Sequence, residues 1–480
     1  MHDAPVFLLG DTIRHLQDVA PTLTVLDYLR TIEKMPGTKE GCAEGDCGAC
    51  TVVLGEVQAG DAIRYRAVNA CVLFVPALDG KQLLTVEHLA GADGALHPVQ
   101  AAMVDHHASQ CGFCTPGFVM SLYALYVSGQ PADRSAVNEA LSGNLCRCTG
   151  YRPIVDAALA SCAAPEVRSA ATTALRLRGL ASDGMAPIAH GGQTYWAPRS
   201  IGALSQIFAL HPDAVLLAGG TDIGLWVTKQ HRTLSAIIAL DGVAGLDTIE
   251  STAETLMIGA TARYEEVMPA LGAHYPDVAA LFGRIGSRQI RNRGTLGGNI
   301  GNASPIGDTP PALIALGAAV VLRQGDTQRS MPLEAFFLGY RTTALRPGEF
   351  IERIDVPLPR PNQAVRCYKV AKRFDQDISA VCAAFSLELA EGVVTRIRIG
   401  FGGMAATPMR AERVEQALLG QQWTEAVVMQ AMTVMDSAFI PLSDPRASAN
   451  YRARVARNLL FKFFLETSDA APATRLTVPV

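Results

Sequence analysis

Eight of the eleven cysteines in this 480-residue chain lie between Cys42 and Cys148, and they form two separate sets. The first set has C-x4-C-x2-C spacing followed by a distant fourth cysteine, and it comprises Cys42, Cys47, Cys50 and Cys71. The second set is a C-x2-C pair followed by a C-x-C pair, and it comprises Cys111, Cys114, Cys146 and Cys148. Clustered cysteines in a reducing compartment indicate metal ligands rather than disulfides.

The first set matches the spacing of plant-type [2Fe–2S] ferredoxins. Gly41, Gly45 and Gly48 lie among its cysteines, and such small residues permit a tight loop whose backbone amides point at a cluster. The alternative is a zinc site, but tetrahedral zinc is usually bound by paired C-x2-4-C knuckles. The spacing therefore favours an iron–sulfur cluster.

The second set is less specific by itself, because C-x2-C with C-x-C could also hold zinc. Its position directly after a ferredoxin-like segment favours a second iron–sulfur cluster. His97, His106 and His107 lie nearby and could suggest a Rieske-type site. Eight cysteines already satisfy two clusters, so we expect these histidines at the surface. The three remaining cysteines are expected to be buried small hydrophobic residues: Cys162, Cys367 and Cys382.

Composition excludes several classes of function. The formal net charge is −4 and no block of Lys or Arg stands out, so nothing indicates binding to nucleic acid or a membrane surface. No apolar run reaches the roughly 18 residues that span a bilayer. The apolar run Val6–Leu9 is too short for a secretory signal, and no basic segment precedes it. We therefore expect a cytoplasmic protein without membrane or nucleic-acid partners.

The pattern changes along the chain. Short β-like runs dominate the first 85 or so residues, with one helix start in which Thr24 and Asp27 have capping-box-like spacing. Four helices are then expected over Val99–His107, Thr115–Val127, Arg134–Leu141 and Pro153–Ala160. An Ala-, Ser- and Thr-rich stretch follows and indicates a linker. The remainder alternates short strands, helices and Gly-rich turns, which is typical of a mixed α/β or α+β domain.

Two Gly-rich loops in the second half indicate a nucleotide site. Leu216–Gly224 follows a β-like run, and a strand that leads into a Gly-Gly-Thr turn exposes backbone N–H groups that can bind a pyrophosphate. Thr295–Asp308 is dense in Gly, Asn, Ser and Thr. A third segment, Gly400–Ala405, fits the Rossmann pattern G-x-G-x-x-A. However, Val394–Ile399 alternates polar and apolar residues, which predicts a half-exposed antiparallel strand instead.

Three segments resemble the xanthine oxidase/dehydrogenase family of molybdenum hydroxylases: EGCAEGDCGAC at 40–50, QCGFCTPG at 110–117 and NLCRCTGYR at 144–152. The resemblance implies a multidomain α+β chain with a β-grasp ferredoxin-like domain at 1–88 and a four-helix [2Fe–2S] bundle at 89–163. A linker at 164–192, a vanillyl-alcohol-oxidase-like FAD domain at 193–360 and an α+β C-terminal flavoprotein domain at 361–480 follow. Gln110 matches the residue that reaches the molybdopterin; alternatively it is a polar residue at a helix terminus.

Both Gly-rich loops resemble the FAD domain of the same family. The implied flavin contacts are Leu216, Leu217, Ala218, Gly219, Gly220, Thr221, Asp222, Ile223, Ile285, Gly286, Thr295, Gly298, Asn299, Asn302, Gly307, Asp308, Ile351 and Lys369. Tyr340 matches a residue on the nicotinamide side, and Lys372–Ser379 resembles a mobile loop beside the flavin ring. Lys369 could alternatively be a solvated strand lysine. At Gly307 many relatives have Ser, which removes one hydroxyl contact.

The resemblance also implies a reaction. Hypoxanthine and xanthine would be hydroxylated at molybdopterin in a separate large subunit, since this chain contains no such domain. Electrons would pass through two [2Fe–2S] clusters to FAD and then to NAD, and no residue of this chain would catalyse the hydroxylation. A heterotetramer of two small and two large subunits is expected. The alternatives are an aldehyde or N-heterocycle hydroxylase of the same family, or a non-enzymatic iron–sulfur redox carrier.

Overall fold

The computed structural model describes residues 2–58, 60, 62–163, 165, 170–180, 184–468 and 474. The chain forms two compact units. Unit 1 contains residues up to Ala244 together with the segment Gly286–Gly294, and unit 2 contains Gly245–Ile285 and the residues from Thr295 onward. Among the described residues, none of the helices has the length and apolar character that crossing a bilayer requires.

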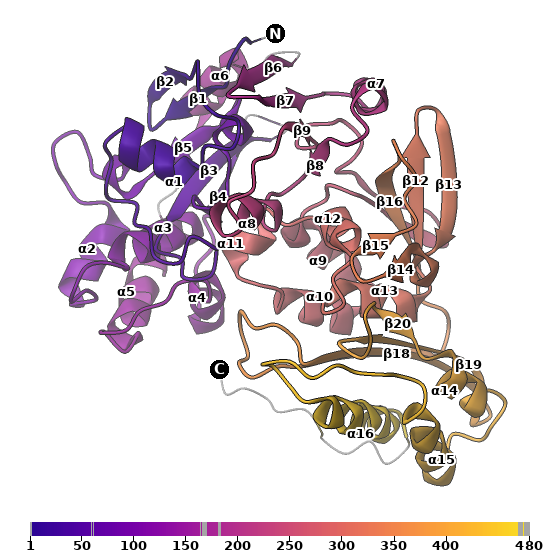
Figure 1. Ribbon diagram of the computed structural model, residues 1–480. Coiled ribbons are helices and arrows are strands. Elements are labelled where there is room, and N and C mark those ends of the chain that lie inside the picture. The colour runs from indigo at the N-terminus through magenta and orange to yellow at the C-terminus, as the bar shows by residue number, and fades with distance from the viewer. Residues whose placement is uncertain are drawn as a thin grey trace. The chain divides into compact units, whose positions relative to one another are not determined.

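Unit 1 begins with a five-stranded sheet of strand order β2-β1-β5-β3-β4, drawn in indigo in Figure 1. Its strands are β1 (Val6–Leu9), β2 (Thr12–His15), β3 (Thr51–Val57), β4 (Ile63–Asn69) and β5 (Gln82–Leu84). β1 pairs in parallel with β5, and the other neighbours are antiparallel, as in a β-grasp fold. Thr24 caps the first helical turn as predicted, by accepting the Asp27 amide at 3.0 Å.

Four short helices follow: α2 (Pro98–Asp105), α3 (Thr115–Tyr126), α4 (Arg134–Leu141) and α5 (Arg152–Cys162). The four predicted helices are thus confirmed, to within two residues at each end. Phe118, Val137 and Ile154 are almost completely buried among them. Cys162 is also buried in this bundle, and Cys382 is buried in unit 2, whereas Cys367 is only partly buried, contrary to prediction.

The predicted linker at 164–192 contains regular structure. Residues 164, 166–169 and 181–183 lie outside the described part of the chain. The remainder includes helix α6 (Ala171–Leu180) and strand β6 (Met185–His190). β6 is the edge strand of a four-stranded sheet ordered β6-β7-β9-β8. The other elements here are β7 (Gln193–Ala197), α7 (Ile201–Leu210), β8 (Val215–Leu217), α8 (Ile223–Thr228) and β9 (Ala236–Ala239).

The segment Gly286–Gly294 belongs to unit 1 although it is distant in sequence. It contains the single helical turn α11 (Arg288–Arg291), whose N-cap Ser287 accepts the Ile290 amide at 3.2 Å. Asn292 donates to the Ala67 carbonyl of β4 at 2.8 Å, and Arg291 pairs with Glu139 of α4. The segment therefore attaches to both the β-grasp sheet and the helical bundle.

Unit 2 has a five-stranded sheet ordered β10-β11-β16-β12-β13 and a small two-stranded sheet of β14 and β15. These strands are β10 (Ile249–Ser251), β11 (Thr255–Gly259), β12 (Ala319–Gln324), β13 (Thr327–Pro332), β14 (Phe337–Gly339), β15 (Thr342–Thr343) and β16 (Phe350–Pro357). The helices are α9 (Tyr264–Gly272), α10 (Pro276–Gly283), α12 (Leu296–Asn302) and α13 (Thr309–Leu316).

The C-terminal part of unit 2 is a four-stranded antiparallel sheet ordered β17-β18-β19-β20. Its elements are β17 (Gln363–Val370), β18 (Val381–Ala390), β19 (Val393–Gly402), β20 (Met409–Arg410), α14 (Glu412–Leu418), α15 (Glu425–Met435) and α16 (Ala449–Thr467). Figure 1 shows these helices in yellow beside the sheet. The Rossmann-like segment Gly400–Ala405 begins within antiparallel β19, so the prediction against a Rossmann strand is confirmed.

Two glycines of unit 2 allow a test of its packing. A Cβ at Gly400 would lie 2.1 Å from the Pro311 carbonyl oxygen, which is backbone and cannot move aside. We expect Gly400→Ala to lower the free energy of unfolding by about 1–3 kcal/mol. Gly283→Ala is the control, because its Cβ would make an ordinary 3.5 Å contact with Met268. The midpoint of urea-induced unfolding measures both, and equal midpoints would contradict the packing described.

Candidate iron–sulfur and flavin sites

Three cysteines of the first set, Cys42, Cys47 and Cys50, lie on the loop between the first helical turns and β3, and Cys71 follows β4. The Cys42 sulfur accepts the Glu44 amide at 3.4 Å and the Cys47 amide at 3.3 Å. The Cys50 and Cys71 sulfurs lie 3.3 Å apart, and both residues are buried. The side chains thus form two pairs, Cys42 with Cys47 and Cys50 with Cys71.

Glycine makes this loop possible. A Cβ at Gly41 would lie 2.7 Å from the Cys47 sulfur, so a larger residue would fill the space beside that ligand. Gly48 has φ +71°, and a Cβ there would lie 2.3 Å from the Gly143 carbonyl oxygen. Glycine at these two positions therefore leaves room for the Cys47 sulfur and permits close contact with the backbone of residue 143.

Within each pair the surroundings favour a thiolate at one of the two cysteines. The neighbouring Cys47 thiol, with the amides of Glu44 and Cys47, lowers the pKa of Cys42 to about 4. Hydrogen bonding from Cys71 and Asn69 lowers the pKa of Cys50 despite its burial. The hydrogen bond to the partner sulfur, together with burial, raises the pKa of Cys47 and that of Cys71. Thiolates are the form of cysteine that binds metal ions. The donor set therefore fits an iron–sulfur cluster.

The second cysteine set lies at the start of α3 and in the loop before α5. The Cys148 sulfur is 3.8 Å from both the Cys111 and the Cys146 sulfurs. Burial raises the pKa of Cys146, but hydrogen bonds from Thr149 outweigh it and the pKa falls to about 7. Cys111 and Cys148 are exposed, in contrast to the buried pair of the first set.

The three histidines near the second set do not join these cysteines, and the exposure predicted for them is confirmed for His106 and His107 but not for the partly buried His97. His97 caps α2 by accepting the Val99 amide at 3.2 Å, and its ring packs against Tyr123 and Tyr126. His106 and His107 are exposed. Within the described residues, no three His, Cys, Asp or Glu side chains are placed to hold a single metal ion. A pairwise arrangement of sulfurs suits two irons with two cysteines each better than a single zinc ion.

Two hydrogen bonds connect the loop that carries Cys42, Cys47 and Cys50 to the loop before α5 that carries Cys146 and Cys148. These are called the two cysteine loops below. The Leu145 amide donates to the Cys47 carbonyl at 3.0 Å. The Asn144 side-chain amide donates to the Gly48 carbonyl at 3.1 Å. Because Leu145 directly precedes Cys146, the path from Cys47 to Cys146 crosses only one hydrogen bond. The rest of the path is covalent and runs within Cys47 and from Leu145 to Cys146.

The first Gly-rich loop, Leu216–Gly224, runs from the end of β8 into α8. Gly220 has φ +80°. A Cβ at Gly219 would lie 1.9 Å from the Arg293 carbonyl oxygen. Glycine at 219 is therefore required by the protein's own backbone, in addition to any approach of a ligand. A small cavity beside the loop is lined by residues that include Tyr195, Ala218 and Gly219.

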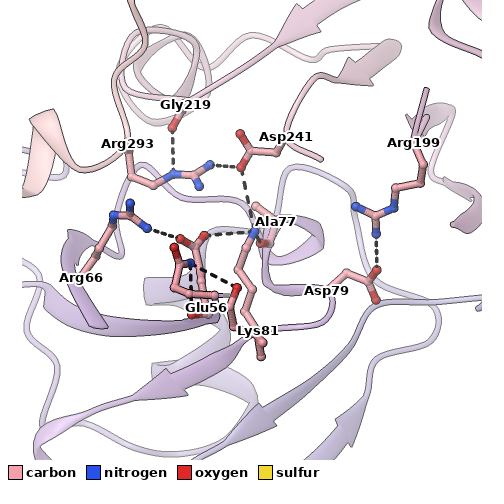
Figure 2. A network of polar contacts seen from close by, with 11 residues as sticks. Glu56, Arg66, Ala77, Asp79, Lys81, Arg199, Gly219, Asp241 and Arg293 are labelled. Atoms are coloured by element: carbon pink, nitrogen blue, oxygen red, sulfur yellow. Dashed lines mark hydrogen bonds and ion pairs between the residues drawn. The ribbon is translucent and has the colours of Figure 1, made fainter. Parts of the chain in front are cut away.

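A charged network lies beneath this loop (Figure 2). Arg293 donates through Nε to the Gly219 carbonyl at 3.4 Å and through Nη2 to Asp241 at 2.5 Å. Lys81 lies 4.0 Å from Asp241 and 3.9 Å from Glu56, which also pairs with Arg66. Glu56, Arg66 and Lys81 come from the β-grasp domain. The network therefore ties the Gly219 turn to the domain that carries the first cysteine set.

The second Gly-rich loop belongs to unit 2 and begins at α12. Thr295 is the N-cap of this helix, and its hydroxyl accepts the Gly298 amide at 3.0 Å. Gly298 is exposed. The Asn299 side-chain oxygen accepts from the Thr309 hydroxyl at 2.5 Å, which leaves the Asn299 amide group to donate elsewhere. A Cβ at Gly307 would lie 3.3 Å from that same oxygen.

The end of this loop contains a buried ion pair. Lys369 Nζ lies 2.7 Å from Asp308 and 2.9 Å from the Arg284 carbonyl, and its side chain is only 2% exposed. The Ser379 hydroxyl donates to the other Asp308 oxygen at 2.5 Å. The alternative of a solvated strand lysine is therefore wrong. Asp308 also neutralises the positive charge of Lys369, so the pair presents a dipole rather than a free cation.

The other predicted residues are placed as follows. Ile351 is buried in β16, Ile285 is partly buried in unit 2, and Gly286 belongs to unit 1 with φ +55°. Tyr340 is 65% exposed between β14 and β15. In the segment Lys372–Ser379, the Arg373 amide donates to Asp377 at 2.8 Å.

The structure adds a role for two residues: Gln289, which the sequence did not single out, and Asn144, which it showed only as the first residue of the 144–152 motif. Gln289 and Asn144 are buried polar residues hydrogen-bonded to each other beside the cysteine loops. Their amide types gave no signal, because burial of a polar side chain depends on tertiary contacts. For Gln289 the available hint was its place in a largely polar run, 287–294, directly before the second Gly-rich loop.

Four family models match the chain in sequence. They are the 2Fe-2S iron-sulfur cluster binding domain at residues 11–76 and the [2Fe-2S] binding domain at 85–159. The FAD binding domain in molybdopterin dehydrogenase matches residues 189–359, and the CO dehydrogenase flavoprotein C-terminal domain matches 366–467. Both cysteine sets and both Gly-rich loops fall within these matches.

Known proteins with similar sequences or structures agree with these four family models. Xanthine dehydrogenase of Emericella nidulans is 32% identical over 95% of this chain and 38% of its own length. Aldehyde oxidase 2 of Cavia porcellus is 29% identical over 99% of this chain and 40% of its own length. The chain thus spans about two fifths of these relatives.

Among solved structures, a carbon monoxide dehydrogenase from Hydrogenophaga pseudoflava that lacks the Mo-pyranopterin moiety is 30% identical, with a TM-score of 0.53. The match covers 55% of this chain and 93% of that one. The cysteine geometry, the family models and these similarities agree. The chain belongs to the molybdenum hydroxylase family of oxidoreductases, as the part that carries the [2Fe–2S] clusters and FAD.

Proposed function

We propose that this chain transfers electrons from a molybdenum-containing partner to NAD, as the iron–sulfur and FAD subunit of a xanthine dehydrogenase. The observation that carries the proposal is the direct link between the two cysteine loops. The Leu145 amide and the Cys47 carbonyl, 3.0 Å apart, join a loop of the first cysteine set to a loop of the second, and each set comprises four cysteines. Such a link suits passage of single electrons through two centres in series, and a sensor with a single centre does not need it.

The residues divide by the group they would hold. We propose that Cys42, Cys47, Cys50 and Cys71 bind the first [2Fe–2S] cluster, and that Cys111, Cys114, Cys146 and Cys148 bind the second. When bound, the molybdenum centre supplies substrate hydroxylation, the clusters carry single electrons and FAD exchanges electron pairs with NAD. This chain contributes ligands, amide donors to the sulfurs and the two Gly-rich loops; its residues do not perform the hydroxylation.

The purine substrates, hypoxanthine and xanthine, are proposed from similarity to xanthine dehydrogenases. The similar aldehyde oxidase keeps an aldehyde or N-heterocycle substrate as the alternative. Substrate choice would reside in the partner, which binds the molecule that is oxidised. A non-enzymatic redox carrier is disfavoured, because such a carrier needs no FAD-binding region.

The second cysteine set lies on a surface suited to a partner. Cys111 and Cys148 are exposed. Phe113 is 48% exposed, Leu145 46% and Tyr151 39%, and each is within three residues of a cysteine of this set. Clustered exposed apolar side chains mark interaction sites. We propose that the molybdopterin-binding large subunit covers this surface, with Gln110 directed to the molybdopterin, in a heterotetramer of two small and two large subunits in the cytoplasm.

We also propose a division of the chain into functional domains. Residues 1–88 and 89–163 would hold one cluster each, 193–360 would bind FAD, and 361–480 would complete the flavin part. The FAD-binding residues would come from both Gly-rich loops, with Ile351 and Lys369 as later contacts.

The cluster assignment predicts two spectroscopically distinct [2Fe–2S] centres and about four irons per chain. Cys47→Ser should remove one reduced-state EPR signal, and Cys148→Ser should remove the other, because each set holds its own cluster. Cys382→Ser is the control, since Cys382 is buried in the core of unit 2 and belongs to neither set, so both signals should stay intact. A protein that contains zinc and shows no EPR signal after reduction would refute the assignment.

The flavin assignment predicts that Asp222→Ala and Asn299→Ala lower the affinity for FAD by up to about tenfold each, as expected for loss of one hydrogen bond. Flavin absorbance per chain after dialysis measures the loss, and iron content should not change. Asp213→Ala and Asn450→Ala are exposed controls outside the loops. Full flavin retention in both loop variants would make the loops structural turns. Gly219 is unsuitable for this test, because its substitution would disturb the Arg293 backbone.

The acceptor assignment predicts that the chain, with clusters and FAD but no molybdenum, oxidises NADH with an artificial dye. It should be inactive toward xanthine until the large subunit is added. Tyr340→Ala should weaken NADH:dye turnover while leaving the cofactor spectra unchanged, because the exposed Tyr340 ring would contact the nicotinamide. Leu338→Ala, an equally exposed neighbour, is the control. A fully flavinated sample that does not oxidise NADH would indicate oxygen or another acceptor.

A further inference from the structure

Four buried polar side chains meet beside the two cysteine loops. They are Thr51, Ser121, Asn144 and Gln289, and none is more than 3% exposed. Thr51 directly follows Cys50, and Asn144 stands two residues before Cys146. Ser121 lies on α3, whereas Gln289 comes from α11, in the region that matches the FAD-binding family. Residues from both cluster domains and from the flavin region thus form one group.

Gln289 is the donor at the centre of this group. Its Nε2 donates to Asn144 Oδ1 and Ser121 Oγ, both at 3.1 Å, and to Thr51 Oγ1 at 3.3 Å. The Ser121 hydroxyl donates to the same Asn144 oxygen at 2.7 Å. Asn144 is thereby held in one orientation by two donors. A single side-chain amide thus contacts the first residue of β3, directly after Cys50, and the loop that precedes Cys146.

The orientation of Asn144 sets how the two loops meet. Because its oxygen faces Gln289 and Ser121, its amide group faces the Gly48 carbonyl at 3.1 Å. The next residue, Leu145, donates to the Cys47 carbonyl at 3.0 Å. Rotation of Asn144 would break the first bond and allow the second to lengthen. Electron transfer depends steeply on distance. The separation of the two loops, which these hydrogen bonds hold, would therefore affect the rate of transfer between the clusters.

Stability alone does not explain Gln289. Its Oε1 is buried and has no hydrogen-bond partner among the described residues. An orphaned buried acceptor costs about 1–3 kcal/mol, so an apolar residue of the same shape could be nearly neutral. Without Gln289, Asn144 Oδ1 would still accept from Ser121, and no other member of the group would lose its last partner.

We propose that Gln289 is a positioning residue for electron transfer between the two clusters. The inference rests on the proposed function, which supplies the clusters. The step is passage of one electron from the second cluster to the first, with no bond made or broken and no proton moved. Gln289 touches neither set of cysteines and acts through Asn144.

The test uses the intact protein with both clusters reduced by dithionite. Reduced [2Fe–2S] clusters are paramagnetic, and the splitting between two coupled signals depends on their distance and relative orientation. Gln289→Met should keep iron and flavin content and both EPR signals, but change the splitting and shift the midpoint potential of at least one cluster. If Gln289→Met fails to fold, Ser121→Ala, which removes only a hydroxyl, should change the splitting in the same direction by less.

Gln193→Met is the matched control. Gln193 is a buried amide in the same unit that donates to the Leu234 carbonyl and accepts from Thr22, both at 3.1 Å, away from the cysteine loops. It should leave the splitting and potentials unchanged. The inference is overturned if the splitting and the midpoint potentials do not change in Gln289→Met, or if they change equally in Gln193→Met. The proposed function would stand in either case. Wild-type protein without two reduced-state signals would overturn the proposed function and this inference with it.

Discussion

Unit 1 depends on the burial of polar side chains from one short segment, Ser287–Gly294. Arg291 and Arg293 are at most 4% exposed, and each pairs with a carboxylate, Glu139 and Asp241 respectively. Burying a charge is costly, and removing one partner of such a pair typically destabilises a protein by about 3–5 kcal/mol. Such pairs contribute little net stability, but each connects the segment to another element of unit 1. They connect the helical bundle and the Gly219 turn to this same segment.

Close backbone packing complements these charges. A Cβ at Gly117, in the first turn of α3, would lie 2.2 Å from the Gly48 carbonyl oxygen. Only glycine at 117 allows this approach, which brings the helix that follows Cys114 against the loop that contains Cys47. The two cysteine loops are therefore in direct backbone contact before any cluster is considered. The same reasoning changes the interpretation of Gly219, whose small size is required by the Arg293 carbonyl.

Local features of the sequence predicted much of the fold and the cysteine ligands. Features that depend on tertiary contacts could not be predicted. Cysteine spacing and helix caps act over a few residues, so both cysteine sets, the four bundle helices and the Thr24 cap were recognisable. The helix and strand within residues 171–190 were missed, because a weakly amphipathic Ala- and Thr-rich stretch resembles a linker in composition. The burial of Lys369 and Gln289 depends on partners that are 61 and 145 residues away in sequence, which no local pattern reveals.

The two cysteine sets differ in solvent exposure, and this difference has an electrostatic consequence. Cys50 and Cys71 are buried, whereas Cys111 and Cys148 are exposed. Reduction adds negative charge to a cluster that four thiolates already make anionic, and water stabilises the added charge better than the protein interior does. If the two sets hold clusters as proposed, exposure would raise the potential of the second centre relative to a buried one. A partner that covers Phe113 and Leu145 would remove that water and lower the potential. In the proposed function, assembly would then change the driving force for electron transfer between the two sets.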